Sequence, residues 1–182
     1  MITSATIVLD RDGVINYDKE EHIKSPQEWK PIPGAAKAIA ELNKAGYRVA
    51  IATNQSGLGR GLFDTETLYQ IHAKLNLVVG GAGGEIELIT YCPHHPNENC
   101  LCRKPNTGLL EAIDKELGLC PDRSWIVGDT AKDVLLGKRM GIRSALVLTG
   151  KGQRTIDDGL VSCRETAVFP CLSGFVSWLL DI

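Results

Sequence analysis

The chain has 182 residues, of which 43% are hydrophobic and 23% charged, and a net charge of −2. Those proportions are typical of globular proteins, and a chain of this length buries roughly 70% of its surface on folding, so disulfides are not needed to stabilise its core. We expect one domain over residues 1–182. The small net charge argues against a general affinity for nucleic acid or anionic membranes.

The first residues, MITSATIVLD, contain no basic segment followed by a long apolar run. A signal peptide would have both features. No window reaches the roughly 20 apolar residues that a membrane-spanning helix needs. We therefore expect a cytoplasmic location.

Short runs rich in β-branched residues alternate with helical patterns along most of the chain. Such alternation predicts an α/β fold, with a Rossmann-like parallel sheet covered by helices on both faces. The predicted strands are 5–10, 47–53, 86–91, 124–129 and 143–148, and the predicted helices are 34–46, 64–79, 107–118 and 131–140. After residue 150 the pattern is weaker, and we expect an edge strand at 167–170 and a closing helix at 172–182.

Several predicted helices carry recognisable end signals. Gly34 follows a proline at the start of the first helix, and Asp64 is suited to cap the second. Gly118 and Gly141 end the third and fourth, where a left-handed residue commonly terminates a helix. These signals support the predicted boundaries.

Acidic and hydroxyl side chains gather where three predicted strands end. Asp10 ends the first strand and Asp12 comes two residues later, Thr53 ends the second, and Asp129 ends the fourth with Asp133 shortly after it. The carboxyl ends of parallel strands meet at one edge of a sheet, where ligands bind. Clustered carboxylates repel, and Mg²⁺ relieves that repulsion while also taking phosphate oxygens as ligands. The sequence therefore predicts a magnesium site at this edge.

Four short motifs occur in order: LDRDGV at 9–14, ATN at 52–54, RKP at 103–105 and GDTAKD at 128–133. Together they resemble the four motifs of the haloacid dehalogenase (HAD) superfamily of phosphotransferases. The resemblance implies a HAD-like fold and a Mg²⁺-dependent phosphatase that works through an aspartyl phosphate.

The resemblance also implies a role for each catalytic residue. Asp10 would attack phosphorus as the nucleophile, and Asp12 would protonate the leaving alcohol and then activate water. Thr53 and Lys104 would hold the non-bridging phosphoryl oxygens, where negative charge must be stabilised.

The same resemblance implies a ligand set for the metal ion. The side chain of Asp10, the backbone carbonyl of Asp12 and the carboxylate of Asp129 would hold Mg²⁺. Asp133 would orient Lys104 or a metal-bound water.

A second cluster lies between the third and fourth predicted strands. Four residues with the spacing C-x-H-x₅-C-x-C offer three thiolates and one imidazole: Cys92, His94, Cys100 and Cys102. Such a set suits tetrahedral Zn²⁺ and leaves no open position for water, which is typical of a structural site. We expect His94 rather than the adjacent His95 as the ligand. The loop runs directly into Lys104, so zinc would fix that residue in place.

The other three cysteines stand singly in the sequence. Cys120, Cys163 and Cys171 have apolar neighbours, and a cytoplasmic location argues against disulfides. We expect all three to be buried core thiols.

Many HAD proteins carry a cap domain inserted after the first or third strand, and neither gap here is long enough for one. The chain thus resembles two capless, zinc-containing groups, the D-glycero-D-manno-heptose 1,7-bisphosphate phosphatases and the histidinol phosphate phosphatases. LDRDGVIN, ATNQSGLGRG and YCPHHP are more similar to the heptose group. Resemblance to that group implies thirteen substrate-binding residues: Asp10, Arg11, Asp12, Asp18, Lys19, Glu20, Glu21, Thr53, Asn54, Gln55, Ser56, Arg103 and Lys104.

The residues leave the substrate open. Arg103 and Arg60 could hold a second phosphate, whereas Glu20 and Glu21 could bind the cation of histidinol phosphate. Some members of the heptose group have Lys after the motif-four Asp, and this chain has Thr130 there.

Three alternatives to a heptose bisphosphate substrate remain: histidinol phosphate, a nucleic-acid 3′-phosphate end, and a non-enzymatic zinc-binding module. A nucleic-acid substrate would call for a basic stripe and stacking aromatics, and aromatics make up only 5% of the chain. We expect a small-molecule substrate, no nucleic-acid or membrane partner, and a monomer.

Overall fold

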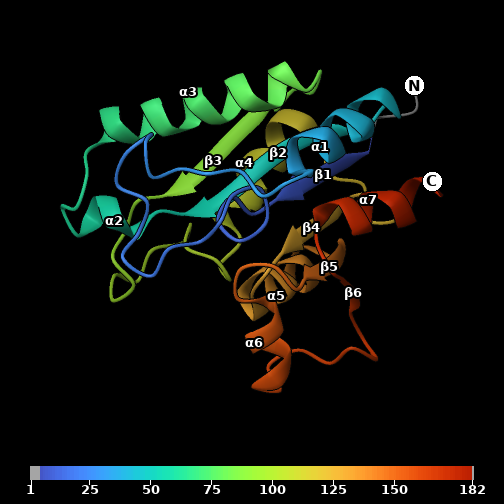
Figure 1. The fold of residues 1–182 in the computed structure, drawn as a ribbon. Coiled ribbons are helices and arrows are strands. Elements are labelled where there is room, and N and C mark those ends of the chain that lie inside the picture. The colour runs from blue at the N-terminus through green and yellow to red at the C-terminus, as the bar shows by residue number, and fades with distance from the viewer. Residues whose placement is uncertain (1–4, 182) are drawn as a thin grey trace.

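The computed structural model describes residues 5–181, which form a parallel six-stranded sheet between two layers of helices (Figure 1). The strand order is β3-β2-β1-β4-β5-β6, and all five pairings are parallel. The strands are β1 (Thr6–Leu9), β2 (Arg48–Asn54), β3 (Leu88–Cys92), β4 (Trp125–Gly128), β5 (Arg143–Val147) and β6 (Ala167–Phe169). The predicted parallel sheet and the predicted edge strand near residue 167 are both confirmed.

Helices cover both faces of the sheet. They are α1 (Ala35–Lys44), α2 (Ser56–Gly59), α3 (Thr65–Gly81), α4 (Gly108–Leu117), α5 (Ala131–Met140), α6 (Gly152–Asp157) and α7 (Leu172–Leu180). Ile7 and Leu9 of β1 face a core shared with α1, α3 and α7, while Val8 faces a second core shared with α4 and α5 (Figure 1). Alternate residues of a strand point to opposite faces, which is why Ile7, Val8 and Leu9 of β1 are all apolar.

The predicted helix ends are largely confirmed. Asp64 accepts a hydrogen bond of 2.8 Å from the backbone N–H of Thr67 and so caps α3. Gly118 ends α4 with φ 74°, and Gly141 ends α5 with φ 67°. Both backbone conformations are costly for residues with a Cβ.

Two short helices, α2 and α6, were not predicted. Each has only one or two turns and contains glycine, so neither has the apolar periodicity on which a prediction depends. β3 begins at Leu88, two residues later than expected. The predicted closing helix is α7, and its expected last residue, 182, lies outside the described part of the chain.

The prediction for the single cysteines was wrong. Cys163 is exposed, and Cys120 and Cys171 are only partly buried. Cys163 lies in the loop after α6, where Ser162 and Arg164 are also exposed, and its apolar neighbours in sequence do not form a core around it.

No helix within residues 5–181 is long and apolar enough to cross a membrane.

Aromatic packing joins α7 to the sheet. The ring of Phe175 is fully buried, with its centroid 5.5 Å from that of Trp125 and 5.4 Å from that of Phe169. Edge-on contacts of this kind add to the free energy of burial. The position of α7 therefore depends strongly on this ring.

We expect Phe175→Ala to lower the free energy of unfolding by about 3–5 kcal/mol, because it removes a buried ring and leaves a cavity. Leu77→Ala, at a side chain that is 76% exposed on α3, is the matched control, and we expect it to change stability by no more than about 0.5 kcal/mol. Urea unfolding of the two variants measures the difference. Similar losses in both would contradict the assigned packing.

Candidate active site

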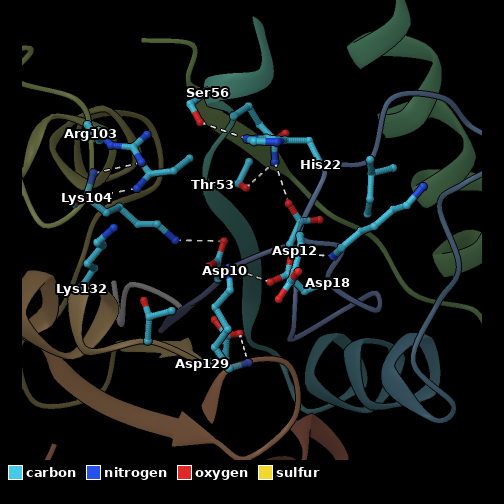
Figure 2. A pocket seen from close by; sticks show the side chains of 17 residues that line it. Asp10, Asp12, Asp18, His22, Thr53, Ser56, Arg103, Lys104, Asp129 and Lys132 are labelled. Atoms are coloured by element: carbon cyan, nitrogen blue, oxygen red, sulfur yellow. Dashed lines mark hydrogen bonds and ion pairs between the residues drawn. The ribbon is translucent and has the colours of Figure 1, made fainter. Parts of the chain in front are cut away.

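A cavity of about 190 Å³ opens at the carboxyl ends of β1, β2 and β4 (Figure 2). Small-molecule pockets commonly hold about 300–1,000 Å³, so this cavity has room for a phosphoryl group and its surroundings, and a larger ligand would extend outward. Its lining is Asp10, Asp12, Asp18, Lys19, Glu20, His22, Ile23, Thr53, Asn54, Gln55, Ser56, Arg103, Lys104, Asp129, Thr130, Lys132 and Lys151.

The ammonium group of Lys104 lies on the cavity floor between two carboxylates. Its Nζ is 2.9 Å from Oδ1 of Asp10 and 2.7 Å from Oδ1 of Asp133, and it donates a hydrogen bond of 2.9 Å to the carbonyl of Ala52. The side chain of Lys104 is only 2% exposed. The carboxylates favour its charged form against the cost of burial, and the pKa of Lys104 is raised.

The backbone of Lys104 is held as firmly as its side chain. Its N–H donates to Oδ1 of Asn54 at 3.0 Å, and its carbonyl accepts from Nδ2 of Asn54 at 3.3 Å. Asn54 is the last residue of β2, so the central sheet itself fixes the loop that carries Lys104.

Three carboxylates could share a metal ion. Oxygen atoms of Asp10, Asp129 and Asp133 all lie within 4.8 Å of one another. Burial raises the pKa of Asp10 to about 7, with further repulsion from Asp133 and Asp12 and an opposing effect of Lys104. Burial and the charge of Asp10 raise the pKa of Asp129 to about 8. Carboxylates whose pKa is raised in this way are stabilised in their charged form by a bound cation, and a set of hard oxygen donors suits Mg²⁺.

Gly13 allows the β1 end to meet the β4 end. It has φ 82°, and a Cβ at this position would collide with the carboxylate of Asp129. Glycine is therefore required here for both backbone conformation and space.

Asp12 lines the cavity, and both oxygens of its carboxylate accept hydrogen bonds from neighbouring side chains. Its Oδ1 accepts hydrogen bonds from Arg11 and Asn16, and its Oδ2 accepts from Arg11 and Gln55. Burial acts to raise the pKa of Asp12, but the charge of Arg11 and these hydrogen bonds outweigh it, and the pKa is lowered. Asp12 is therefore ionised in this arrangement.

Most of the predicted substrate residues line the cavity, with two exceptions. The side chain of Arg11 is fully buried and points away from it. Glu21 lies over a neighbouring hollow with Lys24, Arg60 and His95. Arg11 lies in the turn after β1, and its guanidinium contacts the carboxylate of Asp12, with Nε and Nη2 donating to Oδ1 and Oδ2 at 3.0 Å. A substrate contact from Arg11 would have to come from its backbone N–H, which donates to Oδ1 of Asp10 at 2.7 Å.

Sequence reasoning gave no role to several lining residues: His22, Ile23, Thr130, Lys132 and Lys151. Lys151 follows β5, and its backbone N–H donates to Oδ2 of Asp129 at 2.7 Å. Its ammonium lies 2.8 Å from Oδ2 of Asp18. The strand-end argument that identified Asp10 and Asp129 applies equally to β5 and would have found Lys151.

The four predicted zinc ligands come together in the loop after β3. Sγ of Cys102 is 3.1 Å from Sγ of Cys92 and 3.7 Å from Sγ of Cys100, and Cys92 and Cys100 are 3.6 Å apart. Nδ1 of His94 lies 3.5 Å from Cys92 and 3.2 Å from Cys102. A zinc–sulfur bond of about 2.3 Å gives a tetrahedron with edges of about 3.8 Å. The donor set therefore fits a tetrahedral ion such as Zn²⁺.

Known proteins resemble this chain over nearly its whole length. A family model described as HAD-hydrolase-like matches residues 101–174. A D-glycero-β-D-manno-heptose-1,7-bisphosphate 7-phosphatase of Pseudomonas putida is 49% identical over 96% of this chain and 98% of its own. The enzyme of that name from Pseudomonas aeruginosa is 43% identical, over 99% of this chain and 100% of its own. The chain belongs to this phosphatase family.

Solved structures agree with the sequence relatives. The crystal structure of D,D-heptose 1,7-bisphosphate phosphatase from B. bronchiseptica, complexed with magnesium and phosphate, has a TM-score of 0.93. It is 40% identical, covering 97% of this chain and 98% of that one. The corresponding protein from Burkholderia thailandensis has a TM-score of 0.76 at 38% identity, covering 98% and 100%.

Membership of the 7-phosphatase family decides between the two groups that the sequence left open. The resemblance to the heptose group is confirmed, as is the HAD-like fold. Residues 10–34 and 93–107 contain no named helix or strand, in keeping with the expected absence of a cap.

Proposed function

We propose that this chain removes the 7-phosphate from D-glycero-β-D-manno-heptose 1,7-bisphosphate, a reaction in the synthesis of bacterial lipopolysaccharide precursors. The names of its close relatives support the substrate. The observation that carries the chemistry is the buried contact of Asp10 with Lys104, on the floor of a cavity shared with Asp12 and Asp129.

Asp10 acts as the nucleophile in the first step. A carboxylate oxygen of Asp10 forms a bond to phosphorus, and the bond between phosphorus and the sugar oxygen breaks. The electron pair of that bond goes to the sugar oxygen, which takes a proton from Asp12. The products of this step are the free sugar alcohol and an aspartyl phosphate at Asp10.

Water completes the reaction. Asp12, now ionised, accepts a proton from a water molecule as the water oxygen bonds to phosphorus. The bond between phosphorus and Asp10 breaks, its electron pair returns to the Asp10 carboxylate, and phosphate leaves. Asp12 ends the cycle protonated, ready for the next leaving group.

Lys104 and Thr53 stabilise the transferring group. Lys104 is held on the cavity floor beside the nucleophile, and the hydroxyl of Thr53 accepts a hydrogen bond of 2.9 Å from Gln55, so that its own hydrogen can point elsewhere. Fixed donors placed where charge develops in the transition state can contribute several kcal/mol.

Mg²⁺ fits the carboxylates at the strand ends. The side chains of Asp10 and Asp129 and the backbone carbonyl of Asp12 would hold it, and the raised pKa values of Asp10 and Asp129 support the need for a cation. When bound, the ion neutralises charge on the phosphoryl group. The related B. bronchiseptica enzyme was crystallised with magnesium and phosphate.

The second phosphate of the substrate would lie between Arg103 and Lys132 (Figure 2). Within residues 5–181, neither side chain forms an ion pair with a carboxylate, and Nη1 of Arg103 is buried without a hydrogen-bond partner. Burial, Arg103 and Lys151 together lower the pKa of Lys132. Crowded, unpaired cations favour an anion such as phosphate. Arg60 borders the neighbouring hollow, outside the main cavity.

Zn²⁺ would bind Cys92, His94, Cys100 and Cys102 and serve a structural role. Four protein ligands leave no position for substrate or water. The same loop reaches Lys104 two residues after Cys102, so a metal that fixes the loop also fixes the ammonium group.

We further propose that the protein acts in the cytoplasm as a monomer on this soluble substrate. The reaction as written takes every catalytic group from one chain, so it needs no second copy.

Asp10→Asn is expected to lower phosphate release by about 10⁴-fold or more, because an amide is not a nucleophile at phosphorus. Phosphate release with Mg²⁺ on the β-heptose bisphosphate measures this. Asp157→Asn, at an exposed carboxylate on α6, is the control and should keep the wild-type rate. Retention of more than a tenth of the activity in Asp10→Asn would refute the nucleophile assignment.

Lys132→Ala is expected to raise KM for the bisphosphate roughly tenfold, the equivalent of about 1.4 kcal/mol of lost binding. The same variant should leave KM for heptose 7-phosphate unchanged, since that substrate lacks the second phosphate. Arg60→Ala is the matched control and should affect neither substrate. Equal effects of Lys132→Ala on both substrates, or a larger effect of Arg60→Ala, would place the second phosphate elsewhere.

Cys100→Ser is expected to lower zinc content and Tm, and to lower kcat roughly tenfold or more through displacement of Lys104. Metal analysis, thermal unfolding and phosphate release measure the three effects. Cys163→Ser, at an exposed thiol outside the cluster, should change none of them. A zinc-free Cys100→Ser variant with wild-type stability and rate would show that the metal has no structural role.

A further inference from the structure

The carboxylate of Asp12 has no free lone pair in this structure. A carboxylate accepts about four hydrogen bonds, two on each oxygen. Oδ1 accepts from Nε of Arg11 at 3.0 Å and from Nδ2 of Asn16 at 2.8 Å. Oδ2 accepts from Nη2 of Arg11 and from Nε2 of Gln55, both at 3.0 Å. One of these donors must therefore withdraw before Asp12 can carry a proton.

Arg11 is the donor that is held most firmly. Its side chain has no exposed surface, and it binds both oxygens of Asp12 in the paired geometry that guanidinium and carboxylate groups favour. Its remaining terminal nitrogen, Nη1, lies 3.3 Å from Nε2 of His72 on α3.

His72 must be neutral to make this contact. Only the neutral ring can accept a hydrogen bond at Nε2 from Arg11, since a charged ring would present a second donor. His72 is buried at 7% exposure, and its ring also packs edge-on against Tyr91, with 6.2 Å between centroids. Burial and the charge of Arg11 lower its pKa to about 4, in agreement with the geometry.

Gln55 is the donor best placed to withdraw. It lines the cavity, and its Nε2 also donates to Thr53 at 2.9 Å, so it has another acceptor when it leaves Asp12. Asn16, in contrast, is fully buried and bonded to the carbonyl of Tyr17 as well. The oxygen that becomes free is Oδ2, on the cavity side.

We propose that Arg11 and His72 are a buried positioning pair for Asp12, which holds the carboxylate so that Oδ2 alone exchanges protons with the leaving group. His72 holds the guanidinium of Arg11, and Arg11 sets the plane of the Asp12 carboxylate. This inference rests on the proposed phosphatase activity. It assigns the side chain of Arg11 a function other than the substrate binding predicted from the sequence.

The choice of leaving group distinguishes a misplaced Asp12 from a general loss of structure, which would slow the reaction of every substrate. A sugar or alkyl oxygen needs a proton as its bond to phosphorus breaks, whereas 4-nitrophenolate leaves without one. Misplacing Asp12 should therefore slow phosphoryl transfer to Asp10 from heptose bisphosphate and from glycerol 3-phosphate, and should spare the same first step with 4-nitrophenyl phosphate. Hydrolysis of the aspartyl phosphate also uses Asp12 and is common to all three substrates, so the first step must be measured separately, as the burst of leaving group that accompanies aspartyl phosphate formation.

Three variants test the pair, and two of them, His72→Gln and His72→Asn, differ by a single methylene. His72→Gln keeps an acceptor within reach of Arg11, His72→Asn does not, and Arg11→Lys keeps the charge but cannot bind both oxygens of Asp12. We expect His72→Asn and Arg11→Lys to lower the first-step rate of phosphoryl transfer from the alkyl phosphates about 10- to 100-fold, with KM and the burst rate of 4-nitrophenolate within threefold of wild type. His72→Gln should retain most of the wild-type kcat.

Thermal unfolding of each variant confirms that the rates are measured on folded protein. Equal losses of the first-step rate on aryl and alkyl phosphates, or wild-type first-step rates in both His72→Asn and Arg11→Lys, would overturn the proposal. A wrong substrate assignment would give a different result, because the wild-type protein would then release no phosphate from heptose bisphosphate. The comparison of glycerol 3-phosphate with 4-nitrophenyl phosphate would still test the positioning pair.

Discussion

The burial of one ammonium group between two carboxylates governs the architecture of this active site. Lys104 Nζ lies within 3 Å of Asp10 and Asp133 at a position with almost no solvent contact. Removing such charges from water costs several kcal/mol per ion, which only good geometry and further hydrogen bonds recover. Asp10 follows β1, α5 supplies Asp133, and β2 supplies both the backbone carbonyl of Ala52 and the side chain of Asn54. Each of these elements must be correctly placed before the charge can be buried.

Asp133 shows how closely the fold and the site are connected. Its Oδ2 accepts hydrogen bonds from the N–H and hydroxyl of Thr130 and so completes the start of α5, while its Oδ1 faces Lys104. Gly128 lies beneath, and a Cβ there would collide with the Asp133 side chain. One cation against several buried carboxylates leaves an excess of negative charge. Burial, together with that excess, raises the pKa of Asp10 and Asp129 and favours the binding of a divalent cation.

Much of this arrangement follows from the sequence because strand ends are easy to recognise. The apolar β-branched runs locate the strands, and parallel pairing brings their carboxyl ends together, so the amino-acid sequence alone is enough to group Asp10, Thr53 and Asp129. The grouping of Cys92, His94, Cys100 and Cys102 was equally predictable from residue type and spacing. The contact of Arg11 with His72 was not predictable, because that pairing joins residues 61 apart through the packing of α3.

The cavity contains cations that are paired with carboxylates and cations that are not. This difference explains how a substrate with two phosphates could lose only one of them. Lys104 is neutralised by acids and lies beside Asp10, whereas Arg103 and Lys132 have no acidic partner within residues 5–181 and border the cavity wall. A phosphoryl group beside Lys104 meets the nucleophile, the proton donor and the carboxylates of the metal site. A phosphate between Arg103 and Lys132 meets two cations that form no ion pair with a carboxylate within residues 5–181. On the proposed function, the first position takes the 7-phosphate, and the second binds the 1-phosphate without reacting with it. Regioselectivity then depends on charge placement as much as on the shape of the sugar pocket, and the cation pair that anchors the substrate also protects its remaining phosphate.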